Sequence, residues 1–96
     1  MDQYHIWCNL NDSRDDLTFA DAVDAWLGHL QRQGAVEGWR LTRRKLGLGP
    51  AVLGEFHLVI EVRDLAQLEQ AFGLAATRAE PHEPLHAAVY RLVRDA

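Results

Sequence analysis

The most regular stretch of this 96-residue sequence is Phe56-His57-Leu58-Val59-Ile60-Glu61-Val62. Large apolar side chains occupy every second position, and a period of two is typical of a β-strand with one buried face. Asp64 follows almost at once and can cap a helix, because its carboxylate can accept a hydrogen bond from a free N–H of the first turn. Gln67 fits the capping-box position three residues later. The stretch therefore predicts a strand that leads directly into a helix.

The predicted helix is amphipathic and ends before two prolines. Its apolar side is expected to consist of Leu65, Leu68, Ala71, Phe72, Ala75 and Ala79. Pro81 and Pro84 interrupt the helix, because proline lacks an N–H and disfavours helical geometry in the residue before it. Residues 86–93 then predict a last strand, with Tyr90 and Leu92 in the core and the opposite face formed by Val89, Arg91 and Val93.

The first half of the chain repeats this order. Residues 4–10 alternate as a strand, with Tyr4, Ile6, Cys8 and Leu10 on its apolar face. Thr18 can cap a helix that ends near Gly34, and the apolar side of this helix is formed by Phe19, Ala22, Val23, Trp26, Leu27 and Leu30. Residues 39–44 alternate as a second strand, and the glycine-rich residues 47–54 form the loop to the strand at 56–62.

Two successive strand-helix-strand units predict an α+β fold of the ferredoxin-like type, βαββαβ. Its four-stranded antiparallel sheet has the order 4-1-3-2, and its two helices cover one face. A chain of 96 residues suffices for one such domain, which spans residues 1–96.

The composition of the chain restricts the classes of partner that it can bind. The net charge of −4 argues against nucleic acid and anionic membranes, which need a positive surface. An RNA-recognition motif would also need stacking aromatics on two strands, whereas Trp7 is matched only by His57, Val59 and Glu61. The single cysteine, Cys8, fits a reducing compartment, and no signal peptide or run of 18 apolar residues is present. We therefore expect a cytoplasmic protein with no nucleic-acid or membrane partner.

The sheet face away from the helices is unusually apolar. Its expected members are His5, Trp7, Asn9, Arg40, Thr42, Arg44, His57, Val59, Glu61, Val89, Arg91 and Val93. Trp7 and the valines would form an apolar patch that is atypical of a solvated surface. The commonest cover in small soluble proteins is a second copy related by two-fold symmetry, with a pocket between the copies. We therefore expect a homodimer.

Three stretches together resemble the dimeric α/β-barrel superfamily: Tyr4-His5-Ile6-Trp7, the strand at 56–62 running into Asp64-Leu65, and the connection at 80–86. This superfamily includes the stress-responsive A/B-barrel domains, the antibiotic-biosynthesis-type monooxygenases and many uncharacterised short bacterial proteins. The resemblance covers nearly the whole chain but lies in architecture and pattern, without an invariant motif. It implies a dimer with a ligand pocket and, for an enzyme, a cofactor-independent monooxygenase or isomerase, and it identifies no catalytic residue.

His5 and His57 are the candidate catalytic residues. If the first and third strands run parallel with their starts aligned, His5 lies beside His57, Trp7 beside Val59, and Asn9 beside Glu61. Two imidazoles can serve as acid and base near neutral pH, or they can form a hydrogen-bonded structural pair. Because no clear third ligand accompanies them, we expect no metal and no cofactor.

The expected ligand contacts are Trp7, Asn9, Arg40, Val59, Glu61 and His86. Glu61 is either a catalytic carboxylate or the partner of Arg40 in a cross-strand ion pair, which the hairpin register would place opposite each other. His29 and His82 are expected to be solvated. These residues predict a pocket for a small, partly aromatic or apolar organic ligand. The alternative is a non-catalytic stress-response or interaction protein whose open face serves only dimerisation.

Overall fold

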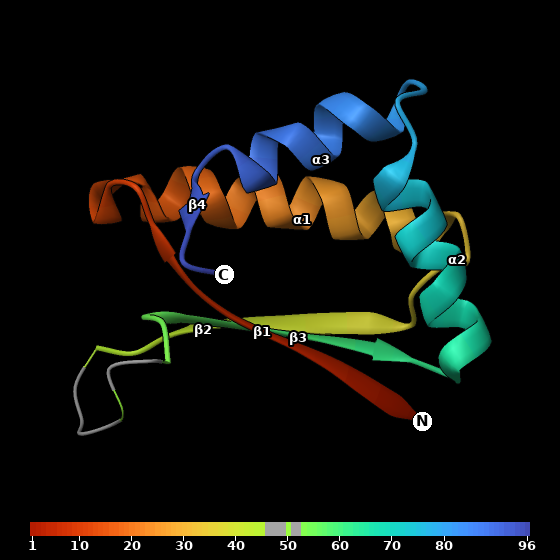
Figure 1. Cartoon of the computed structure of the whole chain (residues 1–96), viewed down its shortest axis with the longest axis horizontal. Coiled ribbons are helices and arrows are strands. Elements are labelled where there is room, and N and C mark those ends of the chain that lie inside the picture. Colours follow the sequence, from red (N-terminus) through yellow and green to blue (C-terminus); the bar gives the residue numbers. More distant parts are fainter. Residues whose placement is uncertain (46–49, 51–52) are drawn as a thin grey trace.

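A four-stranded antiparallel sheet forms the base of the α+β fold (Figure 1). The computed structural model describes residues 1–45, 50 and 53–96. The strands are β1 (Asp2–Leu10), β2 (Gly38–Arg43), β3 (Phe56–Val62) and the two-residue β4 (Val93–Arg94), and they lie in the order β2-β3-β1-β4. The predicted loop at 47–54 falls largely outside the described residues.

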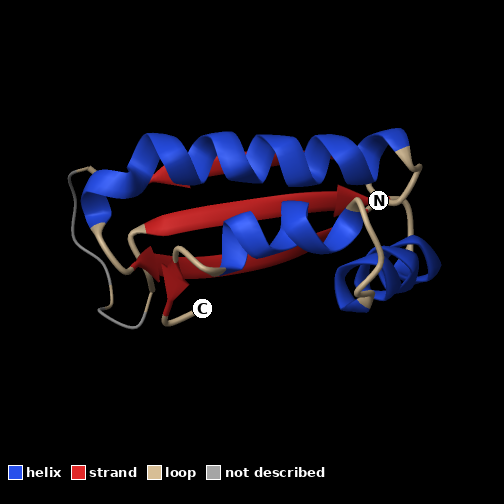
Figure 2. Cartoon of the chain, turned by 90° about the horizontal axis from the view of Figure 1, so that it is seen from above, coloured by secondary structure: helices blue, strands red, loops and turns tan. Residues whose placement is uncertain are grey.

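Three α-helices, rather than the predicted two, lie on one side of this sheet (Figure 1). They are α1 (Asp16–Arg32), α2 (Leu65–Ala76) and α3 (His82–Tyr90), and a short 3-10 turn, Ser13–Asp15, precedes α1. Seen from above, α3 runs beside α1, and α2 stands at the end of the sheet where β3 finishes (Figure 2). The opposite face of the sheet is not covered by any described helix.

The capping residue expected for α2 is used, whereas α1 begins slightly earlier than expected. The Asp64 side chain accepts a hydrogen bond from the Gln67 N–H at 2.9 Å, so the predicted cap is confirmed. The helical path into α1 begins earlier than Thr18, because Asp12 caps the preceding 3-10 turn by accepting from the Arg14 N–H. Gly34 adopts a φ of 75° directly after α1, which is the left-handed conformation that glycine tolerates best.

The predicted strand at 86–93 is wrong, because most of it belongs to α3. Pro84 lies in the first turn of α3, where its missing N–H breaks no helical hydrogen bond. Leu85 and Val89, four residues apart, pack together with Val93 against the core, so Val89 and Val93 do not belong to the open face. Tyr90, which was expected in the core, is exposed.

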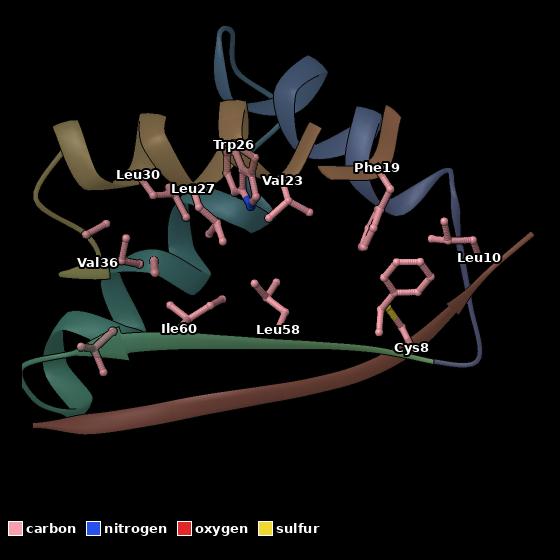
Figure 3. Packing of buried hydrophobic residues seen from close by; sticks show 14 residues of the cluster. Cys8, Leu10, Phe19, Val23, Trp26, Leu27, Leu30, Val36, Leu58 and Ile60 are labelled. Carbon is pink, nitrogen blue, oxygen red and sulfur yellow. The ribbon is translucent and has the colours of Figure 1, made fainter. Parts of the chain in front are cut away.

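The core lies between α1 and the sheet (Figure 3). Side chains of α1 point down to meet Leu58 and Ile60 of β3, and Phe19 meets Phe56 edge to face with ring centroids 5.4 Å apart. Burial alternates strictly along β3, as the sequence pattern predicts. The same alternation sends His57, Val59 and Glu61 to the open face.

The pairing of β1 with β3 is antiparallel, so the parallel register expected from the sequence is wrong. The reason is topological: α1 crosses over and leaves β1 and β2 pointing the same way, and β3 then pairs antiparallel with β2 while lying between the two. In the observed register Trp7 is opposite His57 and His5 is opposite Val59.

Candidate functional site

Three aromatic rings form a stack on the open face. Trp7 and His57 are directly opposite each other on β1 and β3, with ring centroids 4.3 Å apart and planes within 3°. His5 follows two residues earlier on the same face of β1, and its ring centroid is 5.1 Å from that of His57. The predicted neighbours His5 and His57 are therefore brought together, although by a different register.

The two imidazoles are hydrogen-bonded, with 2.9 Å between His5 Nδ1 and His57 Nε2. His5 Nε2 also lies 3.2 Å from Gln3 Oε1, and an amide oxygen can only accept. From these contacts we assign the proton of His5 to Nε2, so that its Nδ1 accepts from the Nε2–H of His57. This assignment leaves the Nδ1 lone pair of His57 as the basic site of the pair.

The pKa of His57 lies below the usual histidine range, first because desolvation penalises the charged imidazolium and second because His5 stands close by. The imidazole of His57 is thus biased towards its neutral form near pH 7. A neutral imidazole with a free ring nitrogen can accept a proton from a bound molecule.

A hollow of about 360 Å³ adjoins Trp7 and His57. Thr42, Arg44 and Glu55 supply polar groups at its wall, and Leu53 contributes apolar surface. It therefore combines an aromatic platform with hydrogen-bonding groups, which is the usual composition of a small-ligand site.

Asn9, an expected ligand contact, is not among the described residues that line this hollow, and its side chain has a structural partner. Asn9 Oδ1 accepts a hydrogen bond from the Glu55 N–H at 3.0 Å and so ties β1 to the residue before β3. Neighbouring Gly54 is buried against the backbone of Cys8, where an added Cβ would come within 2.6 Å of the Cys8 nitrogen. The sequence did not single out Gly54, because only the tertiary contact requires a glycine there.

The predicted cross-strand ion pair of Arg40 and Glu61 is not formed. Arg40 pairs with Val59, and Glu61 pairs with Gly38, so the expected hairpin register is wrong by two positions. Arg40, Val59 and Glu61 still share the open face and, with Gln3, line a smaller hollow of about 130 Å³.

His86 lies on the helix side of the sheet, so its predicted place in the open-face pocket is wrong. It belongs to α3, where its ring stacks on Trp26 with centroids 4.9 Å apart and meets Tyr90 edge to face. The cause is the replacement of the expected strand by α3.

His29 and His82 form a second histidine pair, which the sequence analysis had expected to be solvated. His29 on α1 is buried, and its Nε2 lies 2.7 Å from Nδ1 of His82 on α3. Burial lowers the pKa of His29, and nearby His82 lowers it further. The signal for this pair could be found only once residues 82–90 were recognised as a helix that packs on α1.

Residues 1–45, 50 and 53–96 contain no group of three or more His, Cys, Asp or Glu side chains arranged to hold a metal ion. Over the same part of the chain, no helix has the length and apolar character needed to cross a membrane.

Residues 1–96 match the Family of unknown function (DUF6614), and the chain therefore belongs to that family. No curated protein matches the chain. No solved structure matches it either.

Proposed function

We propose that this member of the DUF6614 family is a homodimer that binds a small organic molecule between two open sheet faces. The supporting observation is Trp7, which lies on the sheet face without helices and is 37% exposed. A large aromatic side chain that is partly exposed gains free energy when a partner covers it. Two copies packed in this way would form the ferredoxin-like dimeric α/β barrel that the sequence resembles.

The ligand site in this proposal is the hollow beside the stack of Trp7 and His57. A planar ring can extend the stack, since offset aromatic rings attract one another beyond the effect of buried area alone. Thr42 and Arg44 at the wall can donate hydrogen bonds to polar substituents. We therefore propose a planar, partly aromatic ligand with polar groups at one edge.

For an enzyme of this kind we assign His57 as the general base. Its pKa is lowered, and its Nδ1 has no hydrogen-bond partner among the described residues. Both features suit proton abstraction from a bound substrate, the first step of a cofactor-independent monooxygenation or isomerisation. His5 is the positioning residue, because it fixes the tautomer of His57 through their hydrogen bond.

A second candidate is a non-catalytic interaction protein whose open face serves only to dimerise. The observation that favours it is the saturation of His5, since both of its ring nitrogens have partners within the protein. In this version the stack is an interface element, and Trp7 packs directly against the partner copy.

We propose a cytoplasmic location, because the single cysteine, Cys8, is free and a reducing compartment keeps thiols free. This free cysteine is buried, and burial raises the pKa of its thiol, so the thiol remains protonated and unreactive. Fluorescence microscopy of a tagged chain tests the compartment.

Light scattering over a range of protein concentrations tests the dimer. The wild type is expected to have twice the mass of one chain at tens of micromolar, and Trp7→Ala is expected to shift the equilibrium towards monomer. Leu17→Ala is the matched control, because Leu17 is also exposed but lies on α1, on the helix side. A monomeric wild type would contradict the dimer, and equal masses for the two variants would contradict an interface through Trp7.

Nuclear magnetic resonance (NMR) with a panel of planar metabolites then distinguishes a ligand-binding dimer from a dimer with a purely structural role. Ligand binding requires that a compound shifts the indole N–H signal of Trp7 and that His57→Gln weakens its affinity. A dimer in which the Trp7 signal responds to none of the compounds supports the purely structural role.

A further inference from the structure

A second cavity, of about 220 Å³, lies on the helix side of the sheet between α1, α2, β1 and β3. Its walls are predominantly apolar, with contributions from Ile6, Leu27, Ile60, Leu68 and Ala71. For scale, an engineered apolar cavity of about 150 Å³ in another protein stays free of water and binds benzene. The space here is large enough for a substituted aromatic ring.

The arrangement of the helices explains why this volume is not filled by the chain itself. α2 stands at the end of the sheet, and α3 packs beside α1 (Figures 1 and 2). The residues that α2 contributes to the lining include Ala71 and Ala75, whose short side chains leave space. Close-packed interiors rarely leave a void of this size without an occupant.

Trp26 provides an unused hydrogen-bond donor at this cavity. The side chain is only 6% exposed, and its nitrogen points from α1 towards the sheet (Figure 3). No described residue accepts a hydrogen bond from this Nε1–H. Every fully buried polar side-chain atom of the described residues has a hydrogen-bond partner, so Nε1 is not fully buried. The N–H must therefore be reachable by a water-sized group, and the cavity that Trp26 lines is the space beside it.

The lining also restricts the charge of an occupant. It contains no Asp, Glu, Lys or Arg among the described residues, and its titratable side chains are Tyr4 and His86. A charged molecule would lose its hydration there without gaining a counter-charge. A neutral molecule has no such penalty.

The rim of the cavity is aromatic and partly open to solvent. Tyr4 of β1 meets Phe72 of α2 edge to face, with ring centroids 5.3 Å apart, and Phe72 is 48% exposed. Both rings line the cavity, which therefore reaches solvent beside Phe72.

We infer that this cavity binds a small uncharged aromatic molecule that presents one hydrogen-bond acceptor, such as a carbonyl oxygen, to Nε1–H of Trp26. The site is separate from the open face, and it needs no dimer. It adds a binding activity on the opposite side of the sheet to the one proposed for Trp7.

Three probes of similar size test the class of ligand: acetophenone, α-methylstyrene and benzoate. Acetophenone has the acceptor, α-methylstyrene has nearly the same shape without it, and benzoate is charged. We expect acetophenone to bind roughly two- to tenfold more tightly than α-methylstyrene, the range expected for one hydrogen bond. Benzoate is expected to bind more weakly than both, because its charge has no partner in the lining.

NMR titration of the three indole N–H signals locates the binding. Acetophenone is expected to shift the signal of Trp26 and to leave that of Trp7 unchanged, and Trp7→Ala is expected to bind it as the wild type does. Saturable binding that leaves Trp26 unshifted, or no binding by any probe up to its solubility, would overturn the inference. These two overturning outcomes are both measured on the wild type, so they do not depend on the result for the open face.

Two variants of α2 test the cavity directly. Ala71→Leu fills the space and is expected to reduce acetophenone affinity at least tenfold, whereas Ala66→Leu, at an exposed position of the same helix, is expected to leave it unchanged. Trp26→Phe is expected to remove the preference for acetophenone over α-methylstyrene. Unchanged affinity in folded Ala71→Leu, or a preference retained in folded Trp26→Phe, would contradict the proposal. If either variant fails to fold, the wild-type titration alone decides.

Discussion

His57 lies flat against Trp7, with ring centroids 4.3 Å apart and planes within 3°, as a directly opposed pair of antiparallel strands. Cross-strand aromatic pairs stabilise a sheet, but this pair lies on the uncovered face. Because Trp7 is still 37% exposed in the single chain, the pair is expected to stabilise the monomer less than a fully buried pair would. Whatever covers that face would bury the remaining exposed surface of Trp7.

This difference predicts unequal effects of two tryptophan substitutions. Trp26→Ala is expected to lower the free energy of unfolding by about 3–5 kcal/mol, because it removes a buried aromatic side chain and leaves a cavity. Trp7→Ala is expected to cost the monomer much less. Urea unfolding at a concentration where the chain is monomeric measures both. Equal losses would show that Trp7 is as much a core residue as Trp26.

The pKa of His57 predicts how stability depends on pH. Its folded-state pKa lies below that of a histidine in the unfolded chain, about 6.5, so the unfolded state binds protons first as the pH falls. The stabilisation linked to neutral His57 is therefore complete above that pH and is lost as the pH falls towards the folded pKa. His57→Gln is expected to show a smaller loss between pH 7 and pH 5.

Thermal unfolding across that range compares the variant with the wild type. Because neutral His29 contributes with the same sign, the double variant His57→Gln/His29→Gln is expected to be less pH-dependent than either single variant. Identical pH profiles for the wild type and His57→Gln would contradict a lowered pKa at His57.

The junction of β3 and α2 could be predicted because its signals are local. Alternation from Phe56 to Val62 and the capping side chain of Asp64 act within a few residues, and the structure uses both. Residues 86–93 were predicted as a strand from the alternation of Val89, Arg91 and Val93, although Leu85 and Val89 also fit a helical spacing. The helix prevails because it packs on α1, a tertiary effect that the local pattern does not contain.

Prediction of the candidate site from the sequence was also limited by tertiary effects. Membership of the open face could be predicted for His5, Trp7 and His57, since parity along a strand fixes the side of the sheet. Which of them touch depends on strand direction and register, and these follow from the whole topology. The pair of His29 and His82 was missed for a related reason: it exists only because α3 is a helix.

Gly54 and Gly73 are expected to respond in opposite ways to the same substitution. Gly54→Ala would place a methyl group against the Cys8 backbone, and we expect a loss of about 1–3 kcal/mol, the usual cost of overpacking. Gly73 is exposed within α2 with nothing within 4 Å of an added Cβ, so Gly73→Ala is expected to stabilise by up to about 1 kcal/mol. Chemical denaturation measures both, and a neutral Gly54→Ala would refute the close approach.

Arg43 connects three parts of the fold, and replacing it by lysine is expected to weaken all three connections. Its guanidinium pairs with Asp16 at the start of α1 at 2.6 Å and with Glu55 at 3.1 Å, and it lies over the ring of Phe56. Lysine keeps the charge but cannot make two directed contacts and a planar stack together. We expect Arg43→Lys to lower the free energy of unfolding by about 1 kcal/mol.

Arg14→Lys is the matched control for this substitution. Arg14 pairs with Asp12 two residues away and is largely exposed, so it joins no separate elements. Its replacement is expected to leave the stability nearly unchanged. Because the contacts of Arg43 are only partly buried, the difference between the two variants should shrink in 1 M salt. A difference that does not depend on salt would assign the role of Arg43 to its packing on Phe56 and not to its ion pairs.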